Sequence, residues 1–160
     1  MVTKRVSILS NIKMRIVKGI DKTNIESILN WSYPYFKTLI SKEKYDDIIK
    51  NETNWDISFI LLNDKDNILG VYLMGDCQLP IDIDDNDISK MVGVEGVLLI
   101  IDDSIRNQGW GNKLKDCPKD LDVDYIWGQQ LKELNNLNDW LKRRTLVTET
   151  INTYITAEIF

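Results

Sequence analysis

The sequence predicts a single α/β domain of the α+β type, with a mixed, mostly antiparallel central sheet flanked by helices. Its 160 residues, 43% of them apolar, can bury a core without disulfides or metals. Apolar runs typical of strands are interspersed with segments of helical spacing. A short polar turn joins two of those runs, as in an antiparallel hairpin. We expect residues 1–160 to form one domain, with residues 1–11 as a flexible N-terminal arm.

The first strand and the first helix are predicted from spacing and capping signals. Ile12–Val17 alternates apolar and charged side chains, which is typical of a strand with one buried side. Thr23 and Glu26 have the spacing of a capping box, in which each side chain bonds the other residue's backbone amide. We therefore expect the first helix over residues 24–31.

A second helical region and a hairpin follow. Apolar residues at helical spacing predict a helix over residues 36–50, with Ser41 as a cap inside it. The aromatic-rich residues 31–36 belong either to the core or to the wall of a substrate pocket. Two β-rich runs, residues 55–62 and 68–74, are separated by a polar turn and predict a hairpin.

The second half of the chain predicts a buried central strand and several later elements. Gly93–Ile101 is almost continuously apolar, as in a strand that is covered on both faces. A helix is expected soon after it. The remaining pattern predicts a strand over residues 123–127, a helix over about 129–143, and a terminal β region over 145–160.

The composition excludes several kinds of site. The chain has no histidine, so Ser-His-Asp and Cys-His catalysis and mixed Cys/His zinc sites are impossible. Cys77 and Cys117 stand alone without metal-ligand spacing, which predicts reduced thiols, no metal and a cytoplasmic protein. A net charge of −5 opposes binding to nucleic acid. The apolar stretches are too short for a membrane span.

The segment Gly75–Val92 is irregular and rich in aspartate. Its spacing does not fit an EF-hand calcium loop, because the required glycine, glutamate and oxygen ligands never coincide in one register. We interpret it as a solvated loop, or as a loop that attracts a cationic substrate.

A glycine-bearing loop after the central strand carries the main functional signal. Arg106-x-x-Gly109-x-Gly111 leads into a helix. Free amides and the dipole at a helix start attract anions, and glycines let a diphosphate approach the backbone. The spacing does not fit a P-loop, because Lys113 does not directly follow Gly111. It does not fit a dinucleotide fingerprint either, because Leu114 occupies the place of the third glycine.

The loop resembles the acyl-CoA pyrophosphate motif, Gln/Arg-x-x-Gly-x-Gly/Ala, of the GNAT N-acetyltransferase superfamily, and the order of predicted elements over residues 12–160 is similar to the GNAT order. The resemblance implies a GNAT fold of about six to seven strands and about four helices. It implies acetyl-CoA or another acyl-CoA as co-substrate and no metal, with the pyrophosphate on the loop and the pantetheine arm along the strand edge. The implied CoA-binding residues are Leu99, Ile100, Ile101, Arg106, Asn107, Gln108, Gly109, Trp110, Gly111, Asn112 and Lys113.

Glu95 is the candidate catalytic residue. It interrupts an apolar strand, where desolvation raises the pKa of a carboxyl group and makes it a better base near neutral pH. The alternative is an acid at the solvated strand start or in a salt bridge. The spacing of Glu95 from Arg106 resembles that of the general-base glutamate in histone-acetyltransferase-like GNATs. The family's thiolate-protonating tyrosine is replaced by Trp140, whose indole cannot serve as that acid. Either water or another hydroxyl helps the thiolate to leave, or a different tyrosine, with Tyr125 and Tyr154 as candidates, protonates it.

The resemblance implies an acyl-CoA-dependent N-acyltransferase that transfers acetyl from acetyl-CoA to a primary amine by direct attack in a ternary complex. The acceptor would be a small-molecule or peptide amine, and the acidic surface favours a cationic one. The alternative is a catalytically inactive GNAT-fold module that binds acyl-CoA or a partner. A nucleotide-phosphate enzyme using the same loop is a more distant alternative. An unpaired terminal strand would allow a homodimer.

Overall fold

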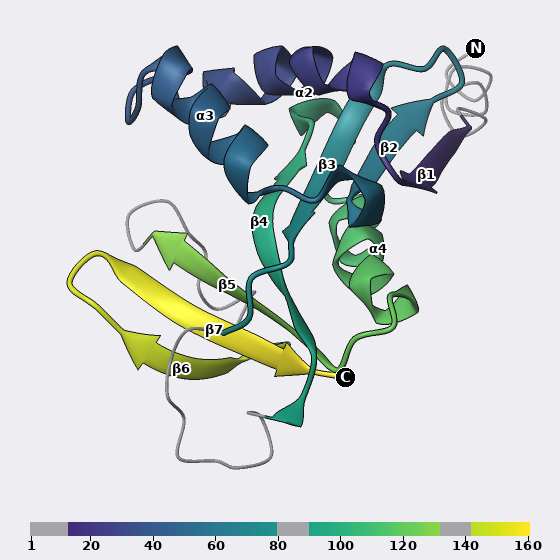
Figure 1. Cartoon of the computed structure of the whole chain (residues 1–160). Coiled ribbons are helices and arrows are strands. Elements are labelled where there is room, and N and C mark those ends of the chain that lie inside the picture. The colour runs from purple at the N-terminus through teal and green to yellow at the C-terminus, as the bar shows by residue number, and fades with distance from the viewer. Residues whose placement is uncertain (1–12, 80–89, 132–141) are drawn as a thin grey trace.

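The computed structural model describes residues 13–79, 90–131 and 142–160, which form one seven-stranded sheet with helices on both faces (Figure 1). The sheet order is β1-β2-β3-β4-β5-β7-β6. Neighbouring strands are antiparallel except for the parallel pair β4 and β5, which confirms the predicted mixed, mostly antiparallel sheet. The strands are β1 (Met14–Lys18), β2 (Phe59–Asn63), β3 (Ile68–Gly75), β4 (Gly93–Ile101), β5 (Tyr125–Leu131), β6 (Thr145–Glu149) and β7 (Thr153–Ile159). The α-helices are α2 (Ile25–Ser32), α3 (Lys42–Glu52) and α4 (Trp110–Asp116).

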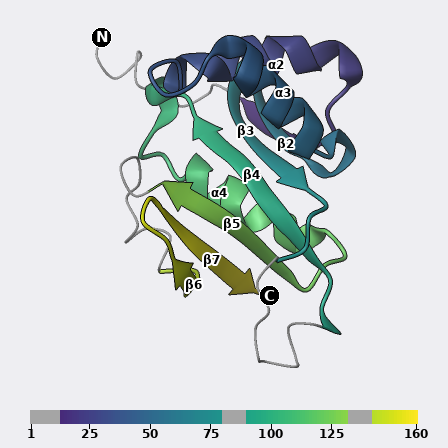
Figure 2. The same cartoon turned by 60° about the vertical axis from the view of Figure 1, so that its left-hand side comes forward.

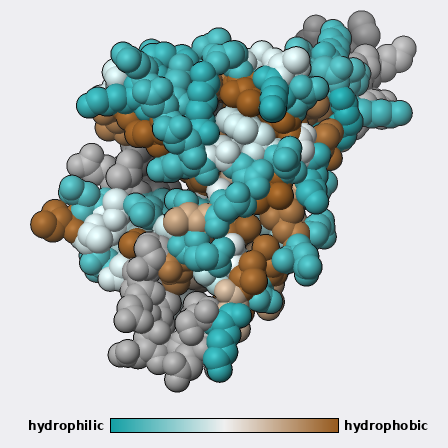
Figure 3. Space-filling model, in the orientation of Figure 1, coloured by the Kyte–Doolittle hydropathy of each residue, from teal (hydrophilic) through white to brown (hydrophobic). Residues whose placement is uncertain are grey.

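Two main apolar cores cover the two faces of the sheet, and a smaller apolar cluster lies on β5 and β7. Alternate residues of β3 enter different cores, because successive side chains of a strand point to opposite faces. Val71 and Leu73 pack with buried residues of α2 and α3, whereas Tyr72 and Met74 pack with Leu114 of α4. Figure 2 shows α2 and α3 in front of the sheet and α4 behind it. The outer surface of α2 and α3 is mostly hydrophilic in Figure 3, as their amphipathic spacing requires.

The first predicted helix begins differently from the expectation. The capping box at Thr23 is wrong, because the Asp21 side chain accepts a hydrogen bond from the Thr23 amide at 3.1 Å and starts a 3-10 turn. Helix α2 then begins at Ile25 without a side-chain cap. The Asp21 carboxylate therefore accepts from the Thr23 amide, which the capping box had assigned to the Glu26 side chain.

The second predicted helix is too long, because its cap divides it. Tyr33–Tyr35 forms a 3-10 turn that contains Pro34, and α3 begins only at Lys42. The Ser41 hydroxyl accepts a hydrogen bond from the Lys44 amide at 3.3 Å, so Ser41 is the helix cap that the sequence indicated. The predicted strand over residues 55–62 is also shorter, because Trp55–Ile57 is a 3-10 turn and β2 begins at Phe59.

We expect Ser41→Ala to lower the free energy of unfolding by about 1 kcal/mol, because the Lys44 amide loses its side-chain acceptor. Urea unfolding followed by circular dichroism measures the change. Thr38→Ala is the control, because this exposed residue precedes the cap and its loss should change stability by less than about 0.5 kcal/mol. Equal stability of the two variants would contradict a stabilising role for the cap.

The C-terminal part confirms one prediction and corrects another. The helix predicted over 129–143 is wrong at its start, because residues 129–131 continue β5 and pair with Thr153–Ile155 of β7; residues 132–141 lie outside the described residues. The terminal β region is confirmed as β6 and β7. Its turn needs no glycine or proline, because the Thr150 hydroxyl accepts a hydrogen bond from the Thr153 amide at 3.0 Å. β6 lies at the edge of the sheet, and a homodimer through it stays a prediction.

Candidate functional site

The strands β4 and β5 pair at one end and then diverge. Their register joins Gly93–Glu95 to Tyr125–Trp127, and among the described residues it extends no further along β4. Figures 1 and 2 show the two strands separating beyond this junction. β4 remains paired with β3 as far as Ile101. Residues 96–101 therefore present one edge whose backbone amides and carbonyls are not paired with β5.

β4 also contains a bulge beside the junction. Leu73 of β3 faces Leu98, whereas the next residue, Met74, faces Gly96. Val97 is therefore an extra residue on β4, which bends the strand and re-aims its neighbours. The bulge lies where the separation from β5 begins.

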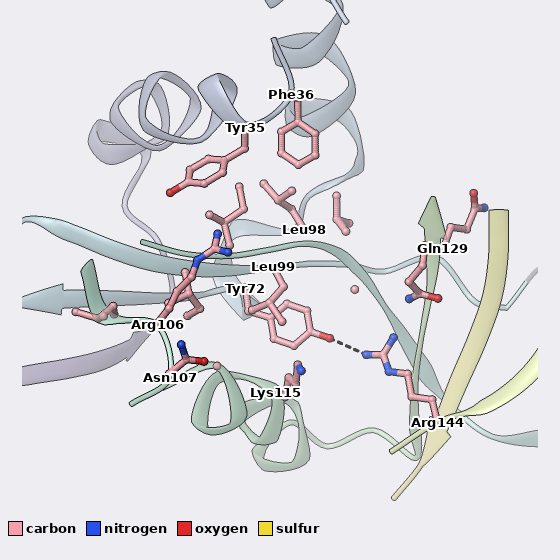
Figure 4. A pocket seen from close by; sticks show the side chains of 17 residues that line it. Tyr35, Phe36, Tyr72, Leu98, Leu99, Arg106, Asn107, Lys115, Gln129 and Arg144 are labelled. Carbon is pink, nitrogen blue, oxygen red and sulfur yellow. Dashed lines mark hydrogen bonds between the residues drawn. The ribbon is translucent and has the colours of Figure 1, made fainter. Parts of the chain in front are cut away.

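A cavity of about 660 Å³ lies along the free edge of β4. Its outer end is formed by the loop after β4 and by α4, and its inner end by β3, β5 and the segment before β6 (Figure 4). Tyr35 and Phe36 lie over the cavity in Figure 4 and also line it. Trp31, Tyr33 and Phe36 also pack against a core cluster. The aromatic segment therefore belongs both to the core and to the wall of the cavity.

The outer end of the cavity has the backbone geometry of an anion-binding loop. Asn107 and Gly109 have φ angles of 63° and 86°, a left-handed conformation that glycine adopts without strain. Gly109 is the N-cap residue of α4, and no side chain caps the start of this helix. The amides in the first turn of α4 have no carbonyl four residues earlier in the helix. The loop therefore offers backbone donors toward a negative group.

Two basic side chains, one from the loop after β4 and one from α4, line the cavity. Arg106 forms an ion pair with Asp103 at 2.8 Å and lines the cavity together with Lys115. Lys113 instead places its Nζ atom 4.1 Å from the centroid of the Trp110 ring. Lys115 was missed by the sequence reasoning, because the helical register that separates it from Lys113 depends on where α4 begins.

The CoA-binding residues predicted from the sequence divide into two groups. Those that line the cavity are Leu99, Ile100, Ile101, Arg106, Asn107 and Gly111. The others, Gln108, Gly109, Trp110, Asn112 and Lys113, belong to the loop and the first turn of α4 but are not among the lining residues. Val97 and Leu98, on the strand edge over 97–101 that the resemblance assigned to the pantetheine arm, also line the cavity. The lining residues that the sequence did not indicate are Tyr72, Gly96, Ile105, Lys115, Gln129, Gln130 and Arg144.

The inner end of the cavity holds a buried tyrosine–arginine pair. Tyr72 and Arg144 are 1% and 6% exposed, and an Arg144 nitrogen donates a hydrogen bond of 2.8 Å to the Tyr72 hydroxyl (Figure 4). Burial raises the pKa of Tyr72, and the charge and hydrogen bond of Arg144 oppose that rise. A Cβ atom on Gly96 would lie 2.9 Å from the Tyr72 hydroxyl. Glycine at this position therefore leaves room for the hydroxyl at the bulge.

Glu95 lies in a second cavity, of about 500 Å³. Burial raises the pKa of Glu95, and the nearby negative charge of Glu52 raises it further. Asp76 lines the same cavity and accepts hydrogen bonds from the Asn54 side chain at 3.0 Å. Gln129 lines both cavities, so the two adjoin at the β4–β5 separation, with carboxylates gathered in the second.

The candidate proton donors named from the sequence do not line the larger cavity. Tyr125 is buried, and its hydroxyl accepts a hydrogen bond from the Leu79 amide at 3.2 Å and donates one to Gln78 at 3.4 Å. Tyr154 lies on β7 and is not among the residues that line either cavity. Trp140 and residues 80–89, which contain most of the acidic segment, lie outside the described residues.

The described residues contain neither a cluster of metal-ligating side chains nor a helix that could span a membrane. Within residues 13–79, 90–131 and 142–160, no group of three or more Cys, Asp or Glu side chains could hold a metal ion. The helices in the same ranges are too short or too polar to cross a membrane.

The comparisons with known proteins rest on structure. No protein-family model and no curated protein matches the sequence. The protein PH1933 of Pyrococcus horikoshii matches with a TM-score of 0.68 at 16% identity, over 94% of this chain and 99% of that one. A GNAT-family acetyltransferase of Staphylococcus aureus gives 0.61 at 14%, over 92% and 99%. Arabidopsis thaliana Naa50, in complex with the bisubstrate analogue CoA-Ac-MVNAL, gives 0.64 at 12%, over 92% and 99%. The chain therefore has the fold of the GNAT acetyltransferases, as its Arg106–Gly111 motif and its order of elements indicated.

Proposed function

We propose that the protein is an acyl-CoA-dependent N-acyltransferase that transfers acetyl from acetyl-CoA to a primary amine by direct attack in a ternary complex. The observation that carries the proposal is the free edge of β4, which runs along a cavity from the glycine loop to the β4–β5 junction. An extended ligand with a diphosphate at one end and amides along its length suits such a cavity, because it can pair with the strand edge as an added strand would.

The residues present fit the parts of CoA. The pyrophosphate would lie on the loop amides of Gln108–Asn112, with Arg106 and Lys115 near its charge. The pantetheine amides would pair with the free backbone groups of Leu99–Ile101. The thioester would then reach the bulge at Gly96 and Val97.

The acceptor would enter from the second cavity. Glu52, Asp76 and Glu95 give that cavity a negative lining, which favours a cationic amine of a small molecule or a peptide. Glu95 would take a proton from the acceptor ammonium, directly or through water, so that a neutral amine attacks the thioester carbonyl. Its raised pKa supports this role, because a base is most effective when its pKa lies near the working pH. The bisubstrate analogue of the Naa50 structure joins CoA to a peptide sequence in one molecule.

The second candidate function is a GNAT-fold module that binds acyl-CoA without chemistry. It is favoured by Trp140 at the position of the family's tyrosine and by the fact that Tyr125 and Tyr154 are not among the residues that line the larger cavity. Both candidates would bind acetyl-CoA, but only the enzyme would transfer its acetyl group.

We expect about 1 mM acetyl-CoA to raise the melting temperature by about 5 °C or more, the shift for a ligand at about 100 times its Kd on a domain of this size. Calorimetry should give saturable binding. With a panel of cationic and neutral amines, release of free CoA thiol should accompany acetylation of at least one cationic amine. The absence of binding would contradict both candidate functions. Binding without thiol release across the panel would favour the module.

A further inference from the structure

The buried pair of Tyr72 and Arg144 at the inner end of the larger cavity has no role in the binding scheme above. The pair joins β3 to the segment before β6, residues far apart in the sequence. Both side chains line the cavity, and Figure 4 shows them directed toward each other across its inner end. Burying a guanidinium group costs free energy unless it is compensated, so the pair calls for an explanation.

The direction of the hydrogen bond leaves the phenol proton available. A guanidinium group can only donate, so the Tyr72 oxygen accepts from Arg144. Among the described residues, the bond from Arg144 is the hydrogen bond that the Tyr72 hydroxyl makes. The O–H group can therefore donate to an atom inside the cavity. Burial raises the pKa of Tyr72, so the hydroxyl keeps its proton at neutral pH and acts as a hydrogen-bond donor.

The position of the Tyr72 hydroxyl matches the reach of a pantetheine arm. Gly96 and Ile101 are five residues apart along β4, which corresponds to about 17 Å of strand at 3.3 Å per residue. An extended chain advances about 1.2 Å per bond, so the dozen or so bonds of a pantetheine arm span about 15 Å. The two lengths are similar, so a thioester whose diphosphate lies at the loop end of the cavity ends at the bulge of Val97 and Gly96, on the side of the Tyr72 hydroxyl.

The charged side chains around the Tyr72–Arg144 pair give it a positive electrostatic environment. Glu158 of β7 and Arg143 also influence Tyr72, but they form an ion pair with each other at 3.8 Å. Lys115 of α4 adds a second cation to the cavity lining. The described acid that faces Tyr72 is therefore paired with Arg143, and Arg144 adds a positive charge beside the hydroxyl.

We propose that the Tyr72 hydroxyl stabilises the departing CoA thiolate by donating a hydrogen bond to its sulfur atom, and that Arg144 strengthens this hydrogen bond by donating its own to the Tyr72 oxygen. The inference rests on the proposed function. When the tetrahedral adduct collapses, the C–S bond breaks and its electron pair stays on sulfur, so that CoA departs as a thiolate that accepts the hydrogen bond of Tyr72. The base takes the first proton of the acceptor ammonium, the nitrogen loses its second proton to solvent after the attack, and the CoA thiolate takes a proton from solvent. No other reactant is needed.

The test compares CoA with desulfo-CoA, which lacks the sulfur atom, by calorimetry across pH. A site that donates a hydrogen bond to the thiolate lowers the pKa of the bound thiol. CoA should therefore tighten relative to desulfo-CoA by about tenfold between about pH 6.5 and pH 9.5. In Tyr72→Phe and in Arg144→Gln the relative tightening should be less than about threefold. The measurement needs no acceptor amine, and desulfo-CoA binding reports in each variant whether the cavity is intact.

Tyr45→Phe is the matched control. Tyr45 is also buried and hydrogen-bonded, to the Ser32 hydroxyl at 2.6 Å, but it lies in the other core. Tyr45→Phe should keep the wild-type pH dependence of CoA binding relative to desulfo-CoA binding. If wild-type protein binds neither ligand, the proposed function and this inference both fail. If CoA binds but its advantage over desulfo-CoA does not change with pH, or survives in both variants, only the role of Tyr72 and Arg144 in stabilising the thiolate is overturned.

Discussion

Glu95→Gln should lower kcat by about 10²–10⁴-fold, because glutamine cannot take the proton of the attacking amine. The affinity for acetyl-CoA should change little, because Glu95 lines the second cavity and not the cavity along the free edge of β4. Steady-state kinetics with the amine selected from the panel measures the first quantity, and calorimetry measures the second. An unchanged kcat would exclude Glu95 as the base.

The pH dependence gives an independent check on the same residue. Burial and Glu52 raise the pKa of Glu95, so the rate should fall as pH decreases through that raised pKa and the carboxylate becomes protonated. This acidic limb should be absent from the residual rate of Glu95→Gln. Glu43→Gln is the control, because Glu43 is an exposed acid in the first turn of α3. Glu43→Gln should retain the acidic limb of the pH–rate profile and the wild-type rate.

The same substitution should stabilise the fold at neutral pH. In the folded protein Glu95 keeps its proton to a higher pH than in the unfolded chain, so unfolding releases a proton between the ordinary and the raised pKa. Wild-type stability therefore falls as pH rises through that window, and glutamine removes this loss. Thermal unfolding at pH 4 and pH 8 should give a larger gain for Glu95→Gln at pH 8. Loss of activity together with a gain of stability is expected of a residue retained for function.

The sequence predicts the fold well where a single physical signal dominates. Gly93–Ile101 was predicted with its observed bounds, because a central strand has a continuous apolar run. Ser41 was predicted as a cap, because its contact is local. The prediction fails at Gln129 and Gln130, which continue β5. Their place in the sheet is set by pairing with β7, and local spacing does not contain that information.

The candidate site shows the same limit. Its loop end, around Arg106, Asn107 and Gly111, could be located from a contiguous motif. Its inner end could not, because Tyr72 and Arg144 meet only through the sheet topology. Tyr72 carries a weak signal, since a hydroxyl in an apolar strand usually needs a partner when buried. Arg144 follows a segment predicted as helix, and nothing in its neighbours indicates a buried cation.

Gly93→Ala should be the most destabilising small change at the β4–β5 junction. A Cβ atom there would lie 2.2 Å from ring atoms of Tyr125, which is buried and faces Gly93 across the parallel pair. The Gln78 side chain also holds Gly93, accepting from its amide at 2.8 Å and donating to its carbonyl at 2.6 Å. Overpacking of this kind costs about 1–3 kcal/mol, which corresponds to a fall of about 5–10 °C in melting temperature at the upper end.

The comparison with Gly111→Ala separates a steric clash from a general effect of replacing glycine. A Cβ atom at Gly111 would have Ile101 at 3.9 Å as its neighbour, and alanine in a helix is favoured over glycine by up to about 1 kcal/mol. Gly111→Ala should therefore be neutral or stabilising. If the Tyr125 ring causes the cost at Gly93, then Gly93→Ala should cost less in a Tyr125→Leu background, because contacting residues are not additive. Equal costs in both backgrounds would mean that Gln78, and not the ring, determines how β4 meets β5 before the strands diverge.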